Sequence, residues 1–512
     1  MTISLLLDMS VSGHPDRTAI TSGAESLTYQ QFADLVQSTG TALRQSGAKN
    51  LVYLGGSGLE LPALLFGAAY AGIPFIPINY RLDGARLVQL INRVGNALVV
   101  AAPRYAESVA AADATVETTD AFFARARKAA PEPLPAAEAD PEGPAVLLFT
   151  SGTTAEPKAV VLRHSHLLSY VMGTVEFGSA DSSDGALITV PPYHVAGIGT
   201  ILTNVYAGRR MIYLPDFDAA EWLRLVRDEA ATSAMVVPTM LDRIVTALDG
   251  NTADVPSLRS LSYGGARMPR PTLEAALRAF PDTGFVNAYG LTETSSTIAL
   301  LGPEDHRAAL DSDDPGVRAR LGAIGRPVPD IEIDIRGVDE KPVGTGEHGE
   351  LWVRGPQVSG EYMGSGSVLD AQGWFPTRDL AYQDSEGFVF IVGRNDDTII
   401  RGGENIAPAE IEDVLVQHPA VRSVAVVGIP DEHWGQAILA AVVLDGDTNP
   451  SSDQLCEFVR SRLRSSRTPD RLIFRTELPA TPTGKILRKE IAADYLAEVS
   501  GSAIGLTSPG KE

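Results

Sequence analysis

Apolar stretches of two kinds alternate along most of the chain. The short ones have the length of buried strands and lie at 51–56, 75–79, 234–239, 258–265 and 285–290. Longer, helix-like stretches lie at 61–72, 240–248 and 271–280. Strands that alternate with helices in this way predict largely parallel β-sheets covered by helices, which is an α/β fold.

A capping box places the start of one further helix. Thr28 and Gln31 have the spacing at which each side chain bonds the other residue's backbone N–H group. Phe32, Leu35 and Val36 then recur at helical spacing. We therefore expect a helix that begins directly after Thr28.

The pattern changes after about residue 393. A charged stretch, GRNDD, leads into a Gly-rich one, IIRGGENIAP. Helix-like segments then lie at 410–418, 452–463 and 488–497, and strand-like segments at 421–429, 437–445 and 472–475. This part is a compact α+β unit of the size of a small domain. We therefore predict a large N-terminal domain, 1–394, and a small C-terminal domain, 395–512.

Length and charge restrict the classes of function. A chain of 512 residues exceeds the size at which one hydrophobic core stops growing, so at least two domains are expected. The formal net charge is −22. Proteins that follow a nucleic-acid backbone present a basic face, so nucleic acid is not expected as a partner.

The single cysteine, Cys456, excludes an internal disulfide and a Cys-rich zinc site. It lies in the apolar run LCEFV, where we expect a buried structural thiol rather than a nucleophile. The first ten residues carry no basic segment, and their apolar run ends at Asp8, unlike a signal peptide. Uninterrupted apolar runs are too short to span a membrane. We therefore expect a cytoplasmic protein.

The strongest local signal is LLFTSGTTAEPK at 147–158. An apolar strand leads here into small hydroxyl residues and a glycine, and the run ends at a lysine: Thr150, Ser151, Gly152, Thr153, Thr154 and Lys158. The hydroxyl and N–H groups of such a loop can surround phosphate oxygens, and the lysine adds positive charge. The pattern is not a Walker loop, because neither GxxxxGKS nor GxxxxGKT occurs. Taken alone, the segment also fits an ordinary Ser/Thr/Gly turn.

Three more motifs follow in order. They are YGLTETSS at 289–296, WFPTRDL at 374–380 with GRNDDTIIRGGENIAPAEIE at 393–412, and PATPTGKILRKE at 479–490. Together with the first motif they resemble the adenylate-forming superfamily, which contains acyl- and aryl-CoA synthetases, firefly-type luciferases and the adenylation domains of peptide synthetases. The resemblance extends over nearly the whole chain, and the ordered set is far more specific than any one motif.

The resemblance implies an ATP site. The hydroxyl-rich loop would cover the β- and γ-phosphates, Tyr289 would flank the adenine, and Thr292 would contact the α-phosphate. Glu293 would hold Mg²⁺. Asp379 would accept hydrogen bonds from both ribose hydroxyls, and Arg394 would support the same region. Three further residues would line the adenine and acyl sites, namely Gly264, Gly265 and Ala266. Gly290 is the remaining implied binding residue.

The implied chemistry is the activation of a carboxylic acid. A carboxylate is a poor electrophile, and its attack on the α-phosphate of ATP forms a mixed anhydride and releases pyrophosphate. Both reactants are anions, so the site must supply positive charge where negative charge builds up. Lys485, in PTGKIL, resembles the lysine of the superfamily that bridges the carboxylate and the phosphate. Without the other motifs it would be interpreted as a surface lysine after a turn.

The resemblance also implies a second step, in which a thiol takes the acyl group and AMP leaves. In the superfamily the small domain rotates between the steps, and Asp396 matches the hinge position. Arg401, Gly402 and Gly403 would then face the site, and the glycines would let a pantetheine arm pass close to the backbone. Basic residues for the phosphates of coenzyme A are expected in 459–475, which has six arginines. A solvated helix face is the alternative for these arginines.

PPYHVAGIG at 191–199 matches the segment in which the family places an aromatic residue or a histidine at the acyl pocket. His194 is therefore a candidate pocket or gate residue, with a satisfied core histidine as the alternative. The segment has no aspartate to hold an α-amino group, which disfavours an amino acid. Ala288 offers no cation for a second carboxylate, although Arg267 could supply one. We therefore expect an apolar fatty or aromatic monocarboxylic acid as substrate.

Three positions depart from the pattern of the family. Ala155 and Ala159 stand where glycine is usual, and Arg378 replaces the usual small residue before the ribose aspartate. Glycine tolerates positive φ and alanine does not, so we expect a changed loop geometry. None of these changes removes a charged catalytic group.

The leading hypothesis is an AMP-forming acid–CoA ligase that uses ATP, Mg²⁺ and coenzyme A. The alternative is a stand-alone enzyme that loads the acyl group onto the phosphopantetheine of a carrier protein, which the same glycine loop would serve. A non-catalytic nucleotide-binding or scaffold protein is disfavoured, because Glu293, Asp379 and Lys485 are all retained. A homodimer is a general expectation for such an enzyme.

Overall fold

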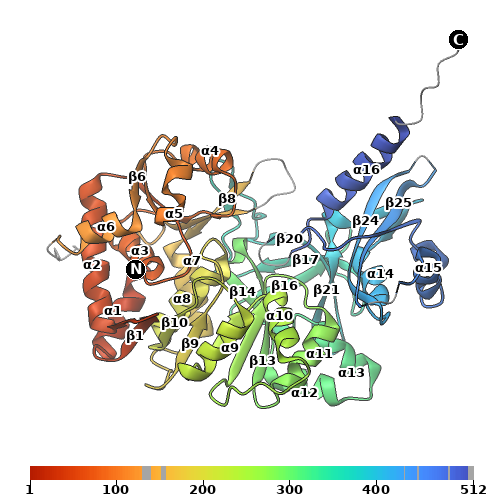
Figure 1. Cartoon of the computed structure of the whole chain (residues 1–512), viewed down its shortest axis with the longest axis horizontal. Coiled ribbons are helices and arrows are strands. Elements are labelled where there is room, and N and C mark those ends of the chain that lie inside the picture. The colour runs from red at the N-terminus through yellow and green to blue at the C-terminus, as the bar shows by residue number, and fades with distance from the viewer. Residues whose placement is uncertain (130–139, 151–156, 432, 447–448, 482–484, 505–512) are drawn as a thin grey trace, which may run out of the picture. The chain divides into compact units, whose positions relative to one another are not determined.

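The computed structural model describes residues 1–129, 140–150, 157–431, 433–446, 449–481 and 485–504 (Figure 1). The chain forms two compact units. The first unit contains Met1–Ile333 and Val353–Pro376, and the second unit contains Asp334–Trp352 and Thr377–Glu512.

Two sheets form the framework of the first unit. Their strands are β1 (Thr18–Ser22), β2 (Glu25–Thr28), β3 (Asn50–Leu54), β4 (Phe75–Pro77), β5 (Ala97–Ala101), β6 (Thr115–Thr118), β7 (Pro144–Thr150), β8 (Lys158–Arg163), β9 (Gly185–Ile188), β10 (Arg210–Tyr213), β11 (Ser233–Val236), β12 (Ser260–Gly264), β13 (Gly284–Leu291), β14 (Ser296–Leu301), β15 (Arg326–Pro327), β18 (Glu361–Tyr362) and β19 (Gly366–Ser367). The orders are β15–β14–β13–β12–β11–β9–β10–β1–β2 and β19–β18–β8–β7–β4–β3–β5–β6. Central neighbours run parallel, and antiparallel pairs lie toward the edges. The predicted α/β fold with largely parallel sheets is confirmed.

Helices cover these sheets. They are α1 (Ser4–Gly13), α2 (Tyr29–Ser46), α3 (Glu60–Ala71), α4 (Gly84–Val94), α5 (Pro103–Ala106), α6 (Thr119–Ala126), α7 (His164–Thr174), α8 (Val195–Ala207), α9 (Ala219–Asp228), α10 (Pro238–Leu248), α11 (Arg270–Ala279), α12 (Pro303–Asp311) and α13 (Pro315–Ala319). In Figure 1, α9, α10 and α11 lie over strands β9–β13, and side chains of all three helices share a core with that sheet. The capping box at Thr28 and Gln31 is present at the start of α2, as predicted.

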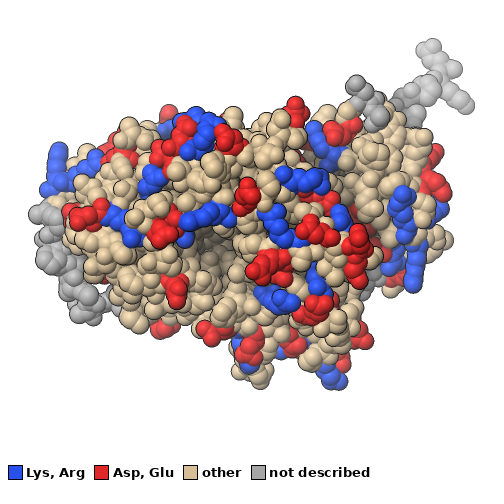
Figure 2. Space-filling view, turned by 90° about the horizontal axis from the view of Figure 1, so that it is seen from below, with Lys and Arg blue, Asp and Glu red and all other residues tan. Residues whose placement is uncertain are grey.

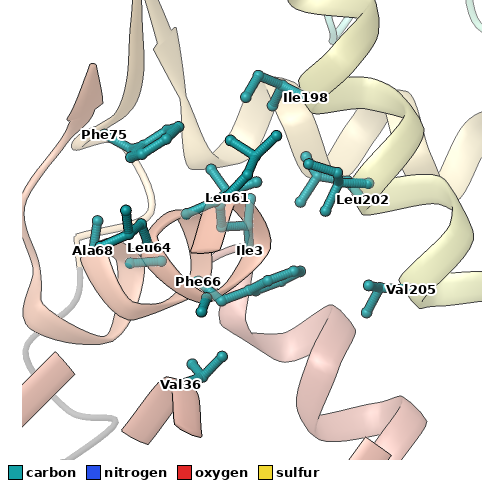
Figure 3. Packing of buried hydrophobic residues seen from close by; sticks show 14 of the residues in the cluster. Ile3, Val36, Leu61, Leu64, Phe66, Ala68, Phe75, Ile198, Leu202 and Val205 are labelled. Carbon is teal, nitrogen blue, oxygen red and sulfur yellow. The ribbon is translucent and has the colours of Figure 1, made fainter. Parts of the chain in front are cut away.

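Helices α1, α3 and α8 meet in the main core of the first unit. Figure 3 shows Ile3, Phe66 and Leu202 among the side chains that gather there, and all three are fully buried. Burial of each side chain of this size contributes about 1.5–3 kcal/mol. Because α8 begins directly after His194, this packing also fixes the position of the backbone at the predicted acyl-pocket histidine.

The second unit contains most of a four-stranded sheet, together with a hairpin and a three-stranded sheet. The strands, in these three groups, are β16 (Glu332–Arg336), β17 (Gly349–Arg354), β20 (Phe375–Gln383) and β21 (Val389–Arg394); β22 (Ile399–Arg401) and β23 (Glu404–Ile406); and β24 (Val421–Asp431), β25 (Gly435–Leu444) and β26 (Arg471–Phe474). The helices are α14 (Pro408–Leu415), α15 (Ser452–Arg460) and α16 (Arg488–Ile504).

Alternate residues of β24 and β25 belong to two different cores. Val426 and Ile438 pack with α14 and α15, whereas Val427 and Leu439 pack with Ile491 of α16. Because successive strand residues point to opposite faces, the three-stranded sheet is covered by helices on both faces. The predicted small α+β domain is confirmed.

The predicted domain boundary after Arg394 lies inside the second unit, at the end of β21. The compact unit begins earlier in the chain because it includes most of the four-stranded sheet. A pivot at Asp396, in the short 3-10 helix Asn395–Asp397, stays a prediction.

Two smaller expectations can be compared with the structure. Cys456 is half-buried on α15, not buried as expected, and its Sγ atom lies 3.6 Å from the Pro469 carbonyl oxygen. Burial raises the pKa of its thiol, which does not favour a nucleophile. Within the described ranges, no helix is long and apolar enough to cross a membrane.

Candidate active site

The two ends of the hydroxyl-rich loop lie side by side. Thr150 ends β7 and Lys158 begins β8, and the two are partners in an antiparallel pair, with Thr150 Oγ1 donating to the Lys158 carbonyl oxygen at 3.3 Å. Ala159 lies within β8 and has no positive φ, so alanine causes no backbone strain at this position, and the changed loop geometry stays a prediction. The rest of the loop lies outside the described residues, so the roles of its members stay predictions: Ser151, Gly152, Thr153, Thr154 and Ala155.

Glu293 is held by a residue that no sequence motif indicated. The Tyr362 phenol donates to Glu293 Oε1 at 2.8 Å. The Nζ atom of Lys158 lies 5.2 Å from the centroid of the same ring. The implied metal ligand and the lysine at the end of the phosphate loop therefore share one aromatic neighbour.

The motif YGLTETSS forms the end of β13, a short 3-10 helix at Thr292–Thr294 and the start of β14. Gly290 is required because a Cβ atom there would lie 1.8 Å from the Ser296 carbonyl oxygen. Ser296 itself has a φ of 119°, a strained conformation for a residue with a side chain. Buried Gln357 donates to two backbone carbonyls of this segment, at 3.0 and 2.8 Å. The turn that carries Glu293 is therefore tightly constrained.

Gly264 ends β12 beside the motif. It is the register partner of Ala288 on the parallel strand β13, and a Cβ atom on Gly264 would lie 2.3 Å from the Ala288 carbonyl oxygen. Gly265 follows with a φ of 82° and Ala266 continues the turn. These residues and Tyr289 lie at the carboxyl ends of adjacent parallel strands, where open α/β sheets bind ligands.

His194 lies at the start of α8 among aromatic rings. Its centroid is 4.7 Å from that of Tyr193, which is 5.5 Å from that of Tyr80. Burial, aided by the charge of Arg81, lowers the pKa of the imidazole to about 4, so the ring is neutral at pH 7. Its buried Nε2 atom has no hydrogen-bond partner within the part of the chain that the structure describes. This argues against the alternative of a satisfied core histidine, and a role in the acyl pocket stays a prediction.

Asp379 and Arg394 face each other on β20 and β21. They are register partners, and Arg394 Nε donates to Asp379 Oδ1 at 2.9 Å. Asp379 is only 4% exposed. The structure thus brings together the two residues predicted for the ribose region.

Arg378, directly before the ribose aspartate, has a φ of 63°. Glycine reaches this conformation without strain, whereas a residue with a Cβ atom does not. The side chain points to the predicted hinge, with Nη1 at 3.7 Å from Asp396 Oδ2. The departure from a small residue therefore stores strain in the backbone and adds an ion pair at the hinge.

Lys485 is exposed in a tight loop of the second unit. The Thr481 N–H donates to the Lys485 carbonyl oxygen at 2.8 Å, and the Lys485 N–H donates to Thr481 Oγ1 at 3.1 Å. Three residues later, Arg488 begins α16 and forms an ion pair with both carboxylate oxygens of Glu412 on α14. The backbone of Lys485 is therefore tied to Thr481, and the start of α16 is tied to α14.

The hairpin β22–β23 turns at Gly402 and Gly403, whose φ values are 58° and 86°. Positive φ at both turn positions is the requirement of a type I′ turn. The Gly402 N–H donates to the Trp434 carbonyl oxygen at 2.8 Å, and a Cβ atom on Gly402 would lie 2.9 Å from the half-exposed Trp434 ring. Arg401 pairs with Asp470 at 2.6 Å, so its role as a phosphate contact stays a prediction.

Several arginines of 459–475 are paired with acids. Arg460, Arg467 and Arg475 form ion pairs with glutamates, which favours the solvated-face alternative for these three. On the face shown in Figure 2, basic and acidic side chains are interspersed.

Known proteins resemble the chain over nearly its whole length. Two family models match it: AMP-binding enzyme at residues 7–363, and AMP-binding enzyme C-terminal domain at residues 410–485. Indoleacetate–CoA ligase of Aromatoleum aromaticum is 32% identical, with 96% of this chain and 98% of that protein covered. A fatty acid–acyl-carrier-protein ligase of Streptomyces coeruleorubidus is also 32% identical, with 93% of each covered. The solved o-succinylbenzoate CoA synthetase of Bacillus subtilis, in complex with its acyl-adenylate, has a TM-score of 0.82 at 25% identity and covers 95% of this chain and 97% of its own.

The chain therefore belongs to the AMP-binding enzyme family. The predicted relationship to adenylate-forming enzymes is confirmed, and so is the predicted enzyme class, an AMP-forming acid–CoA ligase. The roles of individual site residues stay predictions.

Proposed function

We propose that the protein converts an apolar fatty or aromatic monocarboxylic acid, with ATP and Mg²⁺, into its acyl-adenylate and then transfers the acyl group to coenzyme A. The observation that carries the proposal is the retention of Glu293, Asp379 and Lys485 in a chain that matches both family models. Glu293 lies in the short helix after β13, Asp379 lies on strand β20, and Lys485 lies three residues before α16.

Glu293 would hold the metal. Its carboxylate is oriented by the Tyr362 phenol and lies in the turn that follows β13. Mg²⁺ is commonly bound by one or two carboxylates together with substrate phosphates, rather than by a full protein cage. Among the residues that the structure describes, no group of three or more His, Cys, Asp or Glu could hold a metal alone. This donor set fits a metal that arrives with the nucleotide and offsets the charge of its phosphates.

The first step joins two anions. A carboxylate oxygen of the acid attacks the α-phosphorus, the bond from that phosphorus to the pyrophosphate oxygen breaks, and pyrophosphate leaves. Thr292 would contact the α-phosphate, Lys158 would offset charge on the leaving group, and Lys485 would bridge the two reactants. Such fixed positive groups act where charge develops in the transition state.

The second step needs the same space for a thiol. The sulfur attacks the acyl carbon, its proton is lost to solvent, and AMP leaves with the electron pair of the broken C–O bond. We propose that rotation about Asp396, between domains 1–394 and 395–512, withdraws Lys485 and brings Gly402 and Gly403 to the site. The exposed turn of β22–β23 suits such a passage for pantetheine.

The substrate class is supported by the surroundings of His194. A neutral imidazole beside Tyr193 and Tyr80 offers an aromatic wall. Such a wall favours apolar or aromatic groups of the substrate. The acid named for the Aromatoleum relative, indoleacetate, belongs to this class.

A carrier protein's phosphopantetheine is the second candidate acceptor. Arg401, Arg460, Arg467 and Arg475 are all paired with acids, which leaves less positive charge for the nucleotide phosphates of coenzyme A. The Streptomyces relative is named as a carrier-protein ligase. We place the protein in the cytoplasm, where ATP and coenzyme A are available, and a homodimer stays an expectation that light scattering would test.

A pyrophosphate-release screen tests the proposal. Purified protein is incubated with Mg²⁺, ATP and a panel of fatty, benzoic, cinnamic and indole acids, with and without coenzyme A. We expect pyrophosphate release with at least one acid class, and a thioester product when coenzyme A is present. Release without thioester would favour the carrier-protein acceptor, and no release with any acid would overturn the proposed function.

A further inference from the structure

Three segments that are distant in the sequence meet at Tyr362. Its strand, β18, pairs with β8 through Val160, and the next N–H group, that of Met363, donates to the Ala159 carbonyl oxygen at 2.8 Å. Strand β8 begins with Lys158, so the backbone of Tyr362 is fixed against the strand that carries the phosphate-loop lysine.

Both the backbone and the side chain of Glu293 are hydrogen-bonded to the segment that contains Tyr362. Its backbone carbonyl accepts hydrogen bonds from the N–H groups of Ser359 at 2.8 Å and Gly360 at 3.3 Å. Its carboxylate accepts from the Tyr362 phenol at 2.8 Å. The segment before and within β18 therefore determines both where Glu293 lies and which way its carboxylate points.

The chemistry of the phenol suits an orienting role. A tyrosine O–H donates one hydrogen bond, so it can fix one carboxylate oxygen and leave the other for a cation. The face of the ring attracts an ammonium group within about 6 Å, and Lys158 Nζ is 5.2 Å from the centroid. The Tyr362 side chain thus contacts both the Glu293 carboxylate and the Lys158 ammonium.

We propose that Tyr362 is a positioning residue for the nucleotide site: its hydroxyl orients Glu293 toward the metal of the metal–ATP complex, and its ring holds the Lys158 ammonium beside the phosphates. The inference rests on the proposed function, because it assumes that Glu293 is the metal ligand. Tyr362 acts through these two residues and does not itself take part in bond formation.

Two substitutions separate the hydroxyl from the ring. Tyr362→Phe keeps the ring and removes the hydrogen bond, and Tyr362→Leu removes both contacts. Tyr70→Phe is the matched control, because Tyr70 also donates to a carboxylate, that of Asp8, at an exposed position outside the proposed site. Thermal unfolding of each variant establishes that the fold is retained.

The readout is equilibrium binding of ATP by calorimetry, with no acid present, over a series of Mg²⁺ concentrations and in EDTA. Loss of a residue that orients a metal ligand typically weakens metal binding about 10–100-fold. We therefore expect Tyr362→Phe to raise the Mg²⁺ concentration for half-maximal ATP binding about 10-fold and to leave binding in EDTA unchanged. Tyr362→Leu should also weaken the binding in EDTA, because Lys158 loses its contact.

The outcomes distinguish this inference from the proposed function. If the wild type binds Mg²⁺–ATP and Tyr362→Phe binds it with the same Mg²⁺ dependence, the positioning role is overturned while the proposed function stands. If the wild type binds no nucleotide, the proposed function itself fails. In a Glu293→Gln background, Tyr362→Phe should cause no further change in Mg²⁺ dependence, and a further loss there would contradict the action through Glu293.

Discussion

The backbone at Arg378 allows a quantitative test of strain beside the ribose aspartate. Its φ of 63° lies in the left-handed region. The left-handed conformation costs a residue with a Cβ atom about 1–2 kcal/mol, and glycine avoids this cost. Glycine also makes the unfolded chain more flexible, which offsets about 0.4–1 kcal/mol of that gain in stability. Arg378→Ala and Arg378→Gly remove the same ion pair with Asp396. The glycine variant should therefore be more stable than the alanine variant by about 0.5–1 kcal/mol.

The assay is thermal unfolding of both variants under identical conditions. A change of 1 kcal/mol shifts the unfolding temperature by about 2–4 °C in a unit of this size, so the glycine variant should unfold about 1–4 °C higher. Gln383, on the same strand, is the matched control because its φ is not positive. There, glycine should be less stable than alanine by about 0.5–1 kcal/mol. If the alanine variant of Arg378 is as stable as the glycine variant, the backbone at this position is not strained.

Three further variants test other parts of the site. Lys485→Ala should lower pyrophosphate release by orders of magnitude but leave thioester formation from a supplied acyl-adenylate largely intact; equal losses in both steps would contradict its assigned role. His194→Phe should flatten the fall in stability between pH 6.5 and 4. The pKa of His194 is about 4 in the folded state and 6.5 in the unfolded state, so as the pH falls the unfolded state binds a proton first. At pH 5 the free energy of unfolding of the wild type should therefore have fallen by about 2 kcal/mol, and that of the variant should not show this loss. Parallel pH profiles of the two proteins in thermal unfolding would rule this out. Gly290→Ala should destabilise the protein by about 3 kcal/mol, because the added Cβ atom would lie 1.8 Å from the Ser296 carbonyl oxygen. Gly322→Ala is the control and should not destabilise the protein, because its Cβ atom would meet open space. Equal unfolding temperatures of the two variants would contradict the geometry of the turn.

The framework of the first unit was predictable because its signals are local. A continuous apolar run such as that of β3 predicts a strand that is buried on both faces. Helix α3 follows within a few residues, so the sequence also shows the alternation of strand and helix. Strand β8 is not among the strands predicted from the sequence, because the stretch that ends at Lys158 was analysed only as a loop. The boundary of the second unit was also not predictable, since strands from two parts of the chain join in the four-stranded sheet.

The candidate site was predictable only in part, for a related reason. Glu293 and Lys485 lie in motifs whose residue types identify them, whereas Tyr362, Gln357 and Trp434 acquire their contacts from segments far away in the chain. A tyrosine two residues after a glycine has no local pattern that marks it as a partner of a carboxylate. Arg378 was recognised as a departure from the pattern of the family, but only the backbone shows that its φ is positive.

Transfer of an oxygen label tests the proposed adenylation most directly. An acid that supports pyrophosphate release is prepared with ¹⁸O in its carboxylate and converted completely to the thioester, after which AMP is analysed by mass spectrometry. We predict one ¹⁸O atom in each AMP, because the attacking carboxylate oxygen becomes bonded to the α-phosphorus and stays there when the C–O bond breaks. Unlabelled AMP, or label in released phosphate with ADP as the nucleotide product, would show that the acid is not activated at the α-phosphate.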